Sequence, residues 1–302
     1  MARFEFTAEE RAKIVSNFDA GFYEKLVRDL EFHAEKWSLT VLSVVDYFSV
    51  NCIFLCRSAE RGDVALKIGE LRHDVSNETK FLHEYDGGRF VRVLEADEPN
   101  NVILLERIVP GNQLREEQSL EARLVAFSEL HRGLHKPPRD ASEYPTYLEW
   151  VTRITKFMST QTEYRELYEL MRRAEGICAE LWVQYPQRLL LHGDLHHDNI
   201  LLGTDGYKII DPKGVVGDPI FDVPRFIMNE FRGVVNVPYE VYSEHIDKVA
   251  RHLEQSLGIP RSAILKCVFV ETAMARCWTV EGGGVPKVFK VRNAERMMDD
   301  AE

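Results

Sequence analysis

Three side chains between residues 191 and 213 have the types and spacing that phosphoryl transfer requires: Asp194, Asn199 and Asp211. One carboxylate can accept the proton of an attacking hydroxyl, while an amide and a second carboxylate supply oxygen ligands that hold Mg²⁺ against phosphates. We therefore predict that Asp194 is a catalytic carboxylate and that Asn199 and Asp211 form a metal site.

A short β-hairpin is predicted between the two metal ligands. Residues 200–202 and 207–210 read as its strands, and Asp205-Gly206 reads as the tight turn because glycine adopts a positive φ at little cost. A hairpin folds the chain back on itself, so Asn199 and Asp211 are expected to end up close together.

The ordered string from Leu191 to Asp222 resembles the aminoglycoside phosphotransferases, in particular the streptomycin 6-kinase and hydroxyurea-resistance kinase branch. The resemblance rests on His-Gly-Asp-Leu-His-His-x-Asn and on Ile-Asp-Pro-Lys-Gly-Val-Val-Gly-Asp-Pro. Protein kinases instead have H-R-D-L-x-x-x-N and D-F-G, whereas this chain has Gly193 in place of the arginine and Pro212-Lys213 after Asp211. The resemblance implies an ATP-dependent kinase that phosphorylates a hydroxyl of a small molecule.

The resemblance also implies an α+β, two-lobe fold like that of protein kinases. A small antiparallel-sheet lobe with an N-terminal helical extension is expected over residues 1–106, a hinge over 107–112, and a larger, mainly helical lobe over 113–302. ATP is expected in the cleft between the lobes.

Strands of the small lobe are predicted at residues 40–47, 52–57 and 63–68, followed by a helix at 73–86. Lys67 lies in Val-Ala-Leu-Lys-Ile, close to the V-A-I-K string of kinases, and is expected to hold the α- and β-phosphates. Glu78 on the following helix is its expected partner, with Asp74 and Glu84 as rivals.

Ser49 lies in the loop between the first two strands, which covers the phosphates in kinases. This loop has no glycine, but its Phe48-Ser49 pair matches one that the streptomycin-kinase group tends to keep. Ser49 is a candidate phosphate-binding residue, and an ordinary hairpin turn is the alternative interpretation.

A hairpin is predicted at residues 90–106, and its apolar second strand leads to a Pro-Gly break at 110–111. By the resemblance, backbone groups near Glu106 and Ile108 would bind adenine. A plain strand-to-helix loop is the alternative interpretation, and the two do not exclude each other.

Most of the remaining chain is predicted to be helical, at 7–36, 119–135, 161–184, 239–257 and 261–281. Asp222 is expected to anchor the catalytic loop by hydrogen bonds. Lys213 is expected to neutralise charge in the transition state or to pair with a carboxylate. Glu271 and Trp278 either line the substrate pocket or pack in the interior.

The net charge of −11 argues against nucleic acid and anionic membranes as partners, because both bind basic surfaces. It is compatible with a cationic, streptomycin-like aminoglycoside, which four acidic residues would permit: Asp198, Asp218, Glu230 and Glu271. Five cysteines without a C-x-x-C pair, and the absence of a signal peptide or membrane span, favour a cytoplasmic protein. The oligomeric state stays open.

Three alternatives to an aminoglycoside kinase stay open. The acceptor can be another small metabolite, as in hydroxyurea, choline, homoserine or methylthioribose kinases. A protein kinase is disfavoured by Gly193 and by the lack of an A-P-E string. A non-catalytic nucleotide-binding protein fits the missing glycine-rich loop, but the intact Asp194, Asn199 and Asp211 argue against it.

Overall fold

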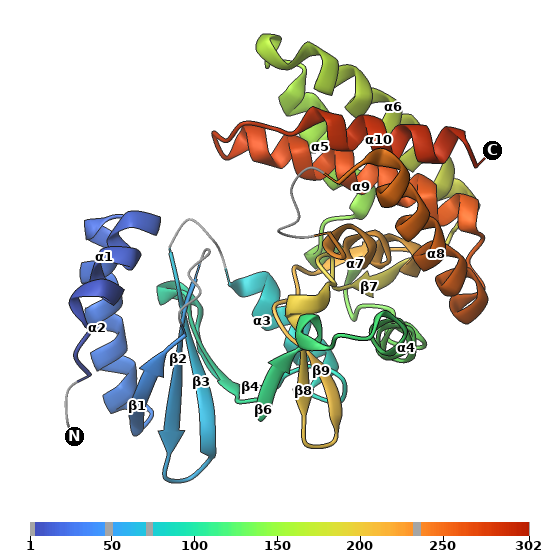
Figure 1. The fold of residues 1–302 in the computed structure, drawn as a ribbon. Helices are drawn as coiled ribbons and strands as arrows, with labels where there is room; N and C mark the ends of the chain where they lie inside the picture. Colours follow the sequence, from blue (N-terminus) through green and yellow to red (C-terminus); the bar gives the residue numbers. More distant parts are fainter. Residues whose placement is uncertain (1–3, 46–50, 71–74, 232–236, 302) are drawn as a thin grey trace. The chain divides into compact units, whose positions relative to one another are not determined.

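The computed structural model describes residues 4–45, 51–70, 75–231 and 237–301 (Figure 1). The chain divides into two compact units. The first contains Met1–Asn112 and Leu202–Ile210, and the second contains Gln113–Leu201 and Asp211–Glu302.

A five-stranded antiparallel sheet in the order β1-β2-β3-β5-β4 forms the centre of the first unit. The strands are β1 (Leu39–Val44), β2 (Asn51–Ser58), β3 (Gly62–Gly69), β4 (Val93–Asp97) and β5 (Val102–Glu106). Alternate residues of β2, such as Cys52, Phe54 and Cys56, are fully buried, as expected for a sheet with one face on a core.

Helices α1 (Ala8–Asn17) and α2 (Ala20–Lys36) pack against this sheet and bury Leu26 and Leu30 in its core (Figure 1). The predicted helical extension over residues 7–36 is confirmed, and the structure divides it into two helices. The Asp19 side chain accepts a hydrogen bond from the Phe22 amide and caps a second helix, so the chain breaks between the two.

The first unit also contains α3 (Ser76–Tyr85) and most of a small sheet in the order β6-β8-β9, of which Gln113 and residues 200–201 belong to the second unit. Its strands are β6 (Pro110–Gln113), β8 (Ile200–Gly203) and β9 (Gly206–Ile209). The predicted hairpin is therefore present, but Leu202–Ile210 belongs to the first unit, whereas the prediction placed all of 113–302 in the second lobe. The reason is long-range pairing, because the Ile209 amide donates to the Arg89 carbonyl at 2.8 Å.

Helices make up most of the second unit (Figure 1). They are α4 (Leu120–His131), α5 (Tyr147–Met158), α6 (Arg165–Gln184), α7 (Pro224–Asn229), α8 (Tyr239–Leu257), α9 (Arg261–Glu281) and α10 (Val288–Asp299). Strands β7 (Leu189–Leu191) and β10 (Val215–Gly217) pair antiparallel beside them. Helix α9 contacts α5, α6, α7, α8 and α10, which explains its apolar composition, and the predicted burial of this helix is confirmed.

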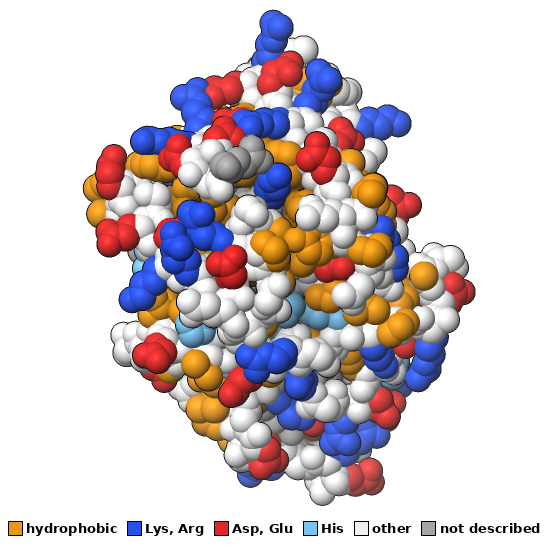
Figure 2. Space-filling model, turned by 90° about the vertical axis from the view of Figure 1, so that its right-hand side faces the viewer, with side chains coloured by type: hydrophobic (Ala, Val, Ile, Leu, Met, Phe, Trp, Pro, Cys, Tyr) orange, Lys and Arg blue, Asp and Glu red, His pale blue; other side chains and the backbone are white. Residues whose placement is uncertain are grey.

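The molecular surface carries charges of both signs. On the face that Figure 2 presents, Lys and Arg side chains alternate with Asp and Glu side chains, and hydrophobic side chains lie between them. Within the described ranges, no helix combines the length and the apolarity that crossing a bilayer would need.

Candidate active site

Asp222 fixes the loop that carries the predicted catalytic residue. Its carboxylate accepts hydrogen bonds from the backbone amides of His192 and Gly193, both at 2.7 Å, and lies 2.9 Å from His135 Nε2. Burial raises the pKa of Asp222, but the hydrogen bond and charge of His135 and the loop contacts hold it below its ordinary value of 3.8. The predicted anchoring by Asp222 is confirmed.

Gly193 turns the chain immediately before Asp194. Its φ is +80°, a region that other residues rarely adopt. A Cβ atom at this position would lie 2.9 Å from Trp150 Cη2 and 3.1 Å from Val215 Cγ1. An arginine in the manner of protein kinases therefore does not fit here.

The two carboxylate oxygens of Asp194 have different surroundings. Oδ1 is buried, 3.5 Å from Arg225 Nε and 3.7 Å from His196 Nε2, whereas the side chain as a whole is 21% exposed. Burial raises the pKa of Asp194, but the Arg225 charge and His196 outweigh burial and hold it well below its ordinary value. Asp194 is thus ionised, and Oδ2 is its more accessible oxygen.

Asn199 and Asp211 flank the β8–β9 hairpin, as predicted. Asn199 Nδ2 donates to the Asp194 carbonyl at 3.0 Å, which orients the amide and leaves its oxygen for another partner. Asp211 has φ +58°, in the left-handed region, and its Oδ2 accepts a hydrogen bond from Lys213 Nζ at 2.9 Å. Lys213 therefore pairs with a carboxylate, which was one of the two expectations for it.

The donor atoms of Asn199 and Asp211 suit Mg²⁺. An amide oxygen and a carboxylate are the hard oxygen ligands that this ion prefers, and it usually takes its other ligands from water and phosphates. Among the described residues, no group of three or more His, Cys, Asp and Glu side chains is placed to hold a metal by itself.

Arg225 and Tyr147 are polar residues of the site that the sequence analysis does not include. Arg225 Nε lies 2.6 Å from Glu271 Oε1, and the Tyr147 hydroxyl donates to Glu271 Oε2. The Arg225 guanidinium also lies 5.2 Å from the Trp278 ring, which makes an edge-to-face contact with Trp150. A signal was available, because Arg225 is a lone charge in the apolar run Val-Pro-Arg-Phe-Ile, and such a charge needs a partner.

The four acidic residues that would permit a cationic substrate all have partners within the protein. Asp198 accepts from Arg115 Nε at 2.5 Å, and Glu230 accepts from Arg123 at 2.8 Å. Asp218 accepts from the Ile220 amide at 3.2 Å and caps the short helix there. Glu271, at 1% exposure, is buried behind Arg225.

Lys67 and Glu78 form an ion pair in the first unit. Their Nζ and Oε2 atoms are 2.5 Å apart, and the two side chains are only 5% and 8% exposed. β3 presents Lys67 beside β5, and α3 supplies Glu78 from its first turn. Ser49 and Asp74 lie outside the described residues.

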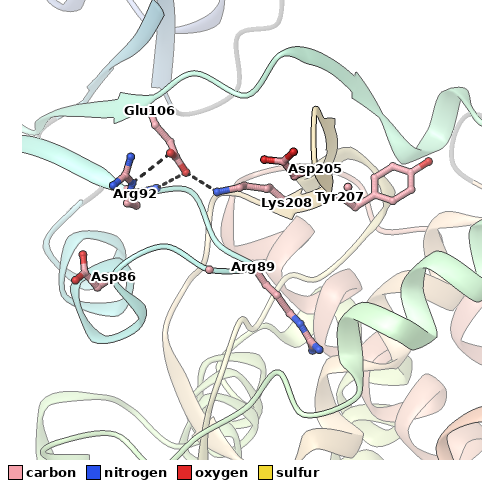
Figure 3. Close-up of a pocket in the computed structure, with 9 residues that line it drawn as sticks. Asp86, Arg89, Arg92, Glu106, Asp205, Tyr207 and Lys208 are labelled. Carbon is pink, nitrogen blue, oxygen red and sulfur yellow. Dashed lines mark hydrogen bonds and ion pairs between the residues drawn. The ribbon is translucent and has the colours of Figure 1, made fainter. Parts of the chain in front are cut away.

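The side chain of Glu106 pairs with two basic residues of the first unit. It accepts from Arg92 Nε at 3.3 Å and from Lys208 Nζ at 3.0 Å, on the wall of a pocket of about 490 Å³ (Figure 3). Its backbone amide donates to the Arg92 carbonyl at 3.0 Å. Ile108 is half-buried and lies beside Gly203. A Cβ atom added to Gly203 would be 3.5 Å from Ile108 Cγ2.

His131 and His135 have structural partners. His131 Nε2 lies 3.0 Å from the Pro219 carbonyl, and His135 contacts Asp222. Burial lowers the pKa of His131 to about 4, so this histidine is neutral at pH 7. The five cysteines are buried and unpaired, as predicted.

The fold belongs to the protein-kinase-like class. Choline kinase LicA from Streptococcus pneumoniae aligns with a TM-score of 0.64 at 17% identity, covering 90% of this chain and 98% of that one. A thermostable mutant of aminoglycoside phosphotransferase APH(4)-Ia, solved with ADP and hygromycin B, aligns with a TM-score of 0.62 at 13% identity, covering 89% and 97%. The predicted fold class is confirmed.

Within this class, the model of the family "Aminoglycoside/hydroxyurea antibiotic resistance kinase" matches residues 39–283, and the chain belongs to that family. The family prediction is therefore confirmed.

Two curated relatives indicate the range of the family. Hydroxyurea phosphotransferase of Kitasatospora aureofaciens is 29% identical over 220 residues, covering 70% of this chain and 63% of that protein. Streptomycin 6-kinase of Streptomyces griseus is 28% identical over 165 residues, covering 53% and 52%. The chain thus matches less than two thirds of the length of either relative.

Proposed function

We propose that the protein transfers the γ-phosphate of ATP to a hydroxyl group of a small molecule. The observation that carries the proposal is the anchored loop of the second unit. There Asp222 holds the backbone of His192 and Gly193, and Asp194 presents one accessible carboxylate oxygen. Membership of a kinase family supports the same reaction.

In the proposed reaction, the acceptor hydroxyl donates its hydrogen bond to Asp194 Oδ2. The acceptor oxygen forms a bond to the γ-phosphorus, the bond from that phosphorus to the bridging oxygen breaks, and ADP leaves with the electron pair. The hydroxyl proton passes to Asp194 and then to solvent. Because the pKa of Asp194 lies below its ordinary value, its carboxylate is a weaker base than a free aspartate, so Asp194 contributes mainly by orienting the hydroxyl, which suits a loose transition state.

The remaining predicted residues would hold the nucleotide. Asn199 and Asp211 would bind Mg²⁺, which supplies neutralisation of phosphate charge. Lys67, held by Glu78, would bind the α- and β-phosphates, and backbone groups of Glu106 and Ile108 would contact adenine. Ser49 stays a candidate phosphate contact, and residues 107–112 stay the proposed hinge.

The proposed acceptor is a streptomycin-like aminoglycoside, as the name of the Streptomyces griseus relative suggests. Hydroxyurea is the second candidate, and a specific observation favours it. Each of the four acidic side chains that would attract a polycation already has a partner within the second unit, notably Arg115, Arg123 and Arg225. An uncharged acceptor does not need a free carboxylate for binding.

The test is an acceptor panel. The purified protein is incubated with ATP and Mg²⁺ and with streptomycin, hydroxyurea, other aminoglycosides, choline or a generic protein substrate, and phosphorylated products are detected by mass spectrometry. We expect transfer to a small molecule, and we expect Asp194→Ala to abolish it. Arg173→Lys, which alters an exposed ion pair, serves as the matched control with unchanged turnover.

Two results would contradict the proposal. Transfer to the protein substrate and to none of the small molecules would indicate a protein kinase. ATP binding without turnover, unchanged by Asp194→Ala, would indicate a non-catalytic nucleotide-binding protein.

A further inference from the structure

Arg225 lies between the predicted catalytic carboxylate and a second, fully buried one. It stands in the first turn of α7, and its Nε is 3.5 Å from Asp194 Oδ1 and 2.6 Å from Glu271 Oε1. Its guanidinium group lies 5.2 Å from the centre of the Trp278 ring. The arginine head is therefore confined from three directions.

Glu271 gives this arrangement a rigid base. It lies in the middle of α9, is 1% exposed, and accepts a hydrogen bond from the Tyr147 hydroxyl of α5. Tyr147 is itself 1% exposed and stacks on Phe221 with ring centres 4.3 Å apart. A chain of contacts thus runs from packed core residues through Glu271 and Arg225 to Asp194.

The geometry acts on one oxygen of Asp194 only. Arg225 faces Oδ1, which is buried, so rotation of the carboxylate would move a charged oxygen away from a cation. The loop backbone is already fixed by Asp222, which leaves the side-chain torsions of Asp194 as the remaining freedom. Arg225 removes that freedom.

We propose that Arg225 is a positioning residue that holds Asp194 so that Oδ2 faces the acceptor hydroxyl, with Glu271 and Tyr147 as its support. This proposal rests on the proposed kinase function. Lysine is not an equivalent replacement, because the Arg225 Nε lies near both carboxylates while the planar guanidinium lies 5.2 Å from the Trp278 ring, and a compact ammonium on a flexible stem provides neither arrangement. The competing interpretation is that Arg225 only neutralises the buried Glu271.

A double-mutant cycle in kcat separates the two interpretations. Arg225→Lys is measured in the wild-type background and in the Asp194→Asn background, with the best acceptor from the panel. If Arg225 acts through the Asp194 carboxylate, the substitution lowers kcat about 10²-fold in the wild type, as misplaced catalytic groups do. In the Asp194→Asn background it changes the residual kcat less than twofold, because the group it positions is already gone.

Further measurements complete the design. The KM for ATP should stay unchanged in Arg225→Lys, and Glu271→Gln should lower kcat in the same direction by a smaller factor. Thermal unfolding identifies any variant that does not fold. If Arg225→Lys does not fold, Glu271→Gln replaces it in the double-mutant cycle. Arg173→Lys is the control for an arginine whose two carboxylate partners, Glu295 and Asp299, lie on α10.

An equal loss of kcat in both backgrounds would overturn the positioning role and leave Arg225 as a structural cation. That outcome differs from failure of the proposed function, in which the wild-type protein phosphorylates no acceptor and the positioning role falls with it.

Discussion

A single buried carboxylate, Asp222, satisfies two backbone amides of the catalytic loop and contacts His135. An amide in its place would turn an NH₂ group towards at least one of these donors. We therefore expect Asp222→Asn to reduce the free energy of unfolding by about 1–3 kcal/mol, the range for leaving a buried hydrogen-bond donor unsatisfied. It should also lower kcat, because the loop before Asp194 loses its anchor.

The pH dependence of this effect has a definite sign. The pKa of Asp222 lies below its ordinary value of 3.8, so its stabilising contribution is present above that value and is lost as the pH falls through the lowered pKa. Urea unfolding of the wild type and Asp222→Asn should converge at low pH. Asp205→Asn, at an exposed turn position, should follow the wild type at every pH, and a pH-independent difference for Asp222→Asn would contradict the assignment.

At this scale the sequence predicts residues that belong to a local string and misses those defined by distant partners. Asp194, Asn199 and Asp211 stand within one segment whose order indicates their chemistry. Arg225 gains its place only through Asp194 and Glu271, which come from other elements. The same reasoning applies to Asp198, Glu230 and Glu271, whose arginine partners no local pattern reveals.

At the scale of elements, the turn at Gly193 is the most restrictive feature of the catalytic loop. The Cβ atom of an alanine at this position would lie too close to Trp150. The alanine would also have to adopt the left-handed backbone conformation that Gly193 has here. We expect Gly193→Ala to cost about 1–3 kcal/mol of stability and to lower kcat more than tenfold, since Asp194 follows directly.

Gly206→Ala is the matched control. Gly206 also has a positive φ, +113°, but a Cβ there meets nothing within 4 Å. Gly206→Ala should reduce the free energy of unfolding, as measured by urea unfolding, and should leave kcat unchanged in steady-state assays. Equal kcat values for Gly193→Ala and the wild type would show that the turn does not set the position of Asp194.

Helices with strong apolar periodicity are predicted well. The predicted helices at 239–257 and 261–281 coincide with α8 and α9, because both are long and end at glycine residues that break the pattern. Helix α5 (Tyr147–Met158) is absent from the predictions, although Thr146 and Glu149 form a capping box before it. This helix is stabilised by the burial of Tyr147 and Val151 against other elements, and a short segment of sequence does not reveal such contacts.

At the scale of the whole molecule, ligand binding should stabilise the chain in a metal-dependent way. If ATP binds with Mg²⁺ as proposed, a concentration of 100 times Kd should add about 2.7 kcal/mol to the free energy of unfolding. EDTA should remove most of this gain. Lys67→Met and Asp211→Asn should each reduce it, whereas Arg173→Lys should keep it.

The measurement is unfolding with ATP alone, with ATP and Mg²⁺, and with ATP and EDTA. A gain that EDTA does not change, or that Asp211→Asn retains in full, would contradict the metal role of Asp211.

The sequence predicts two compact parts but not that the β8–β9 hairpin joins the first of them. That membership depends on pairing between Ile209 and the segment at Phe90, which are far apart along the chain.

The left-handed backbone of Asp211 has an evolutionary consequence. A non-glycine residue in this region carries conformational strain, of the order of 1 kcal/mol, that glycine would relieve. If its carboxylate binds the metal, selection for stability and selection for activity act in opposite directions at this one position. Searches for thermostable variants would then enrich replacements here that fold better and no longer turn over, so this residue should be held constant in any such search.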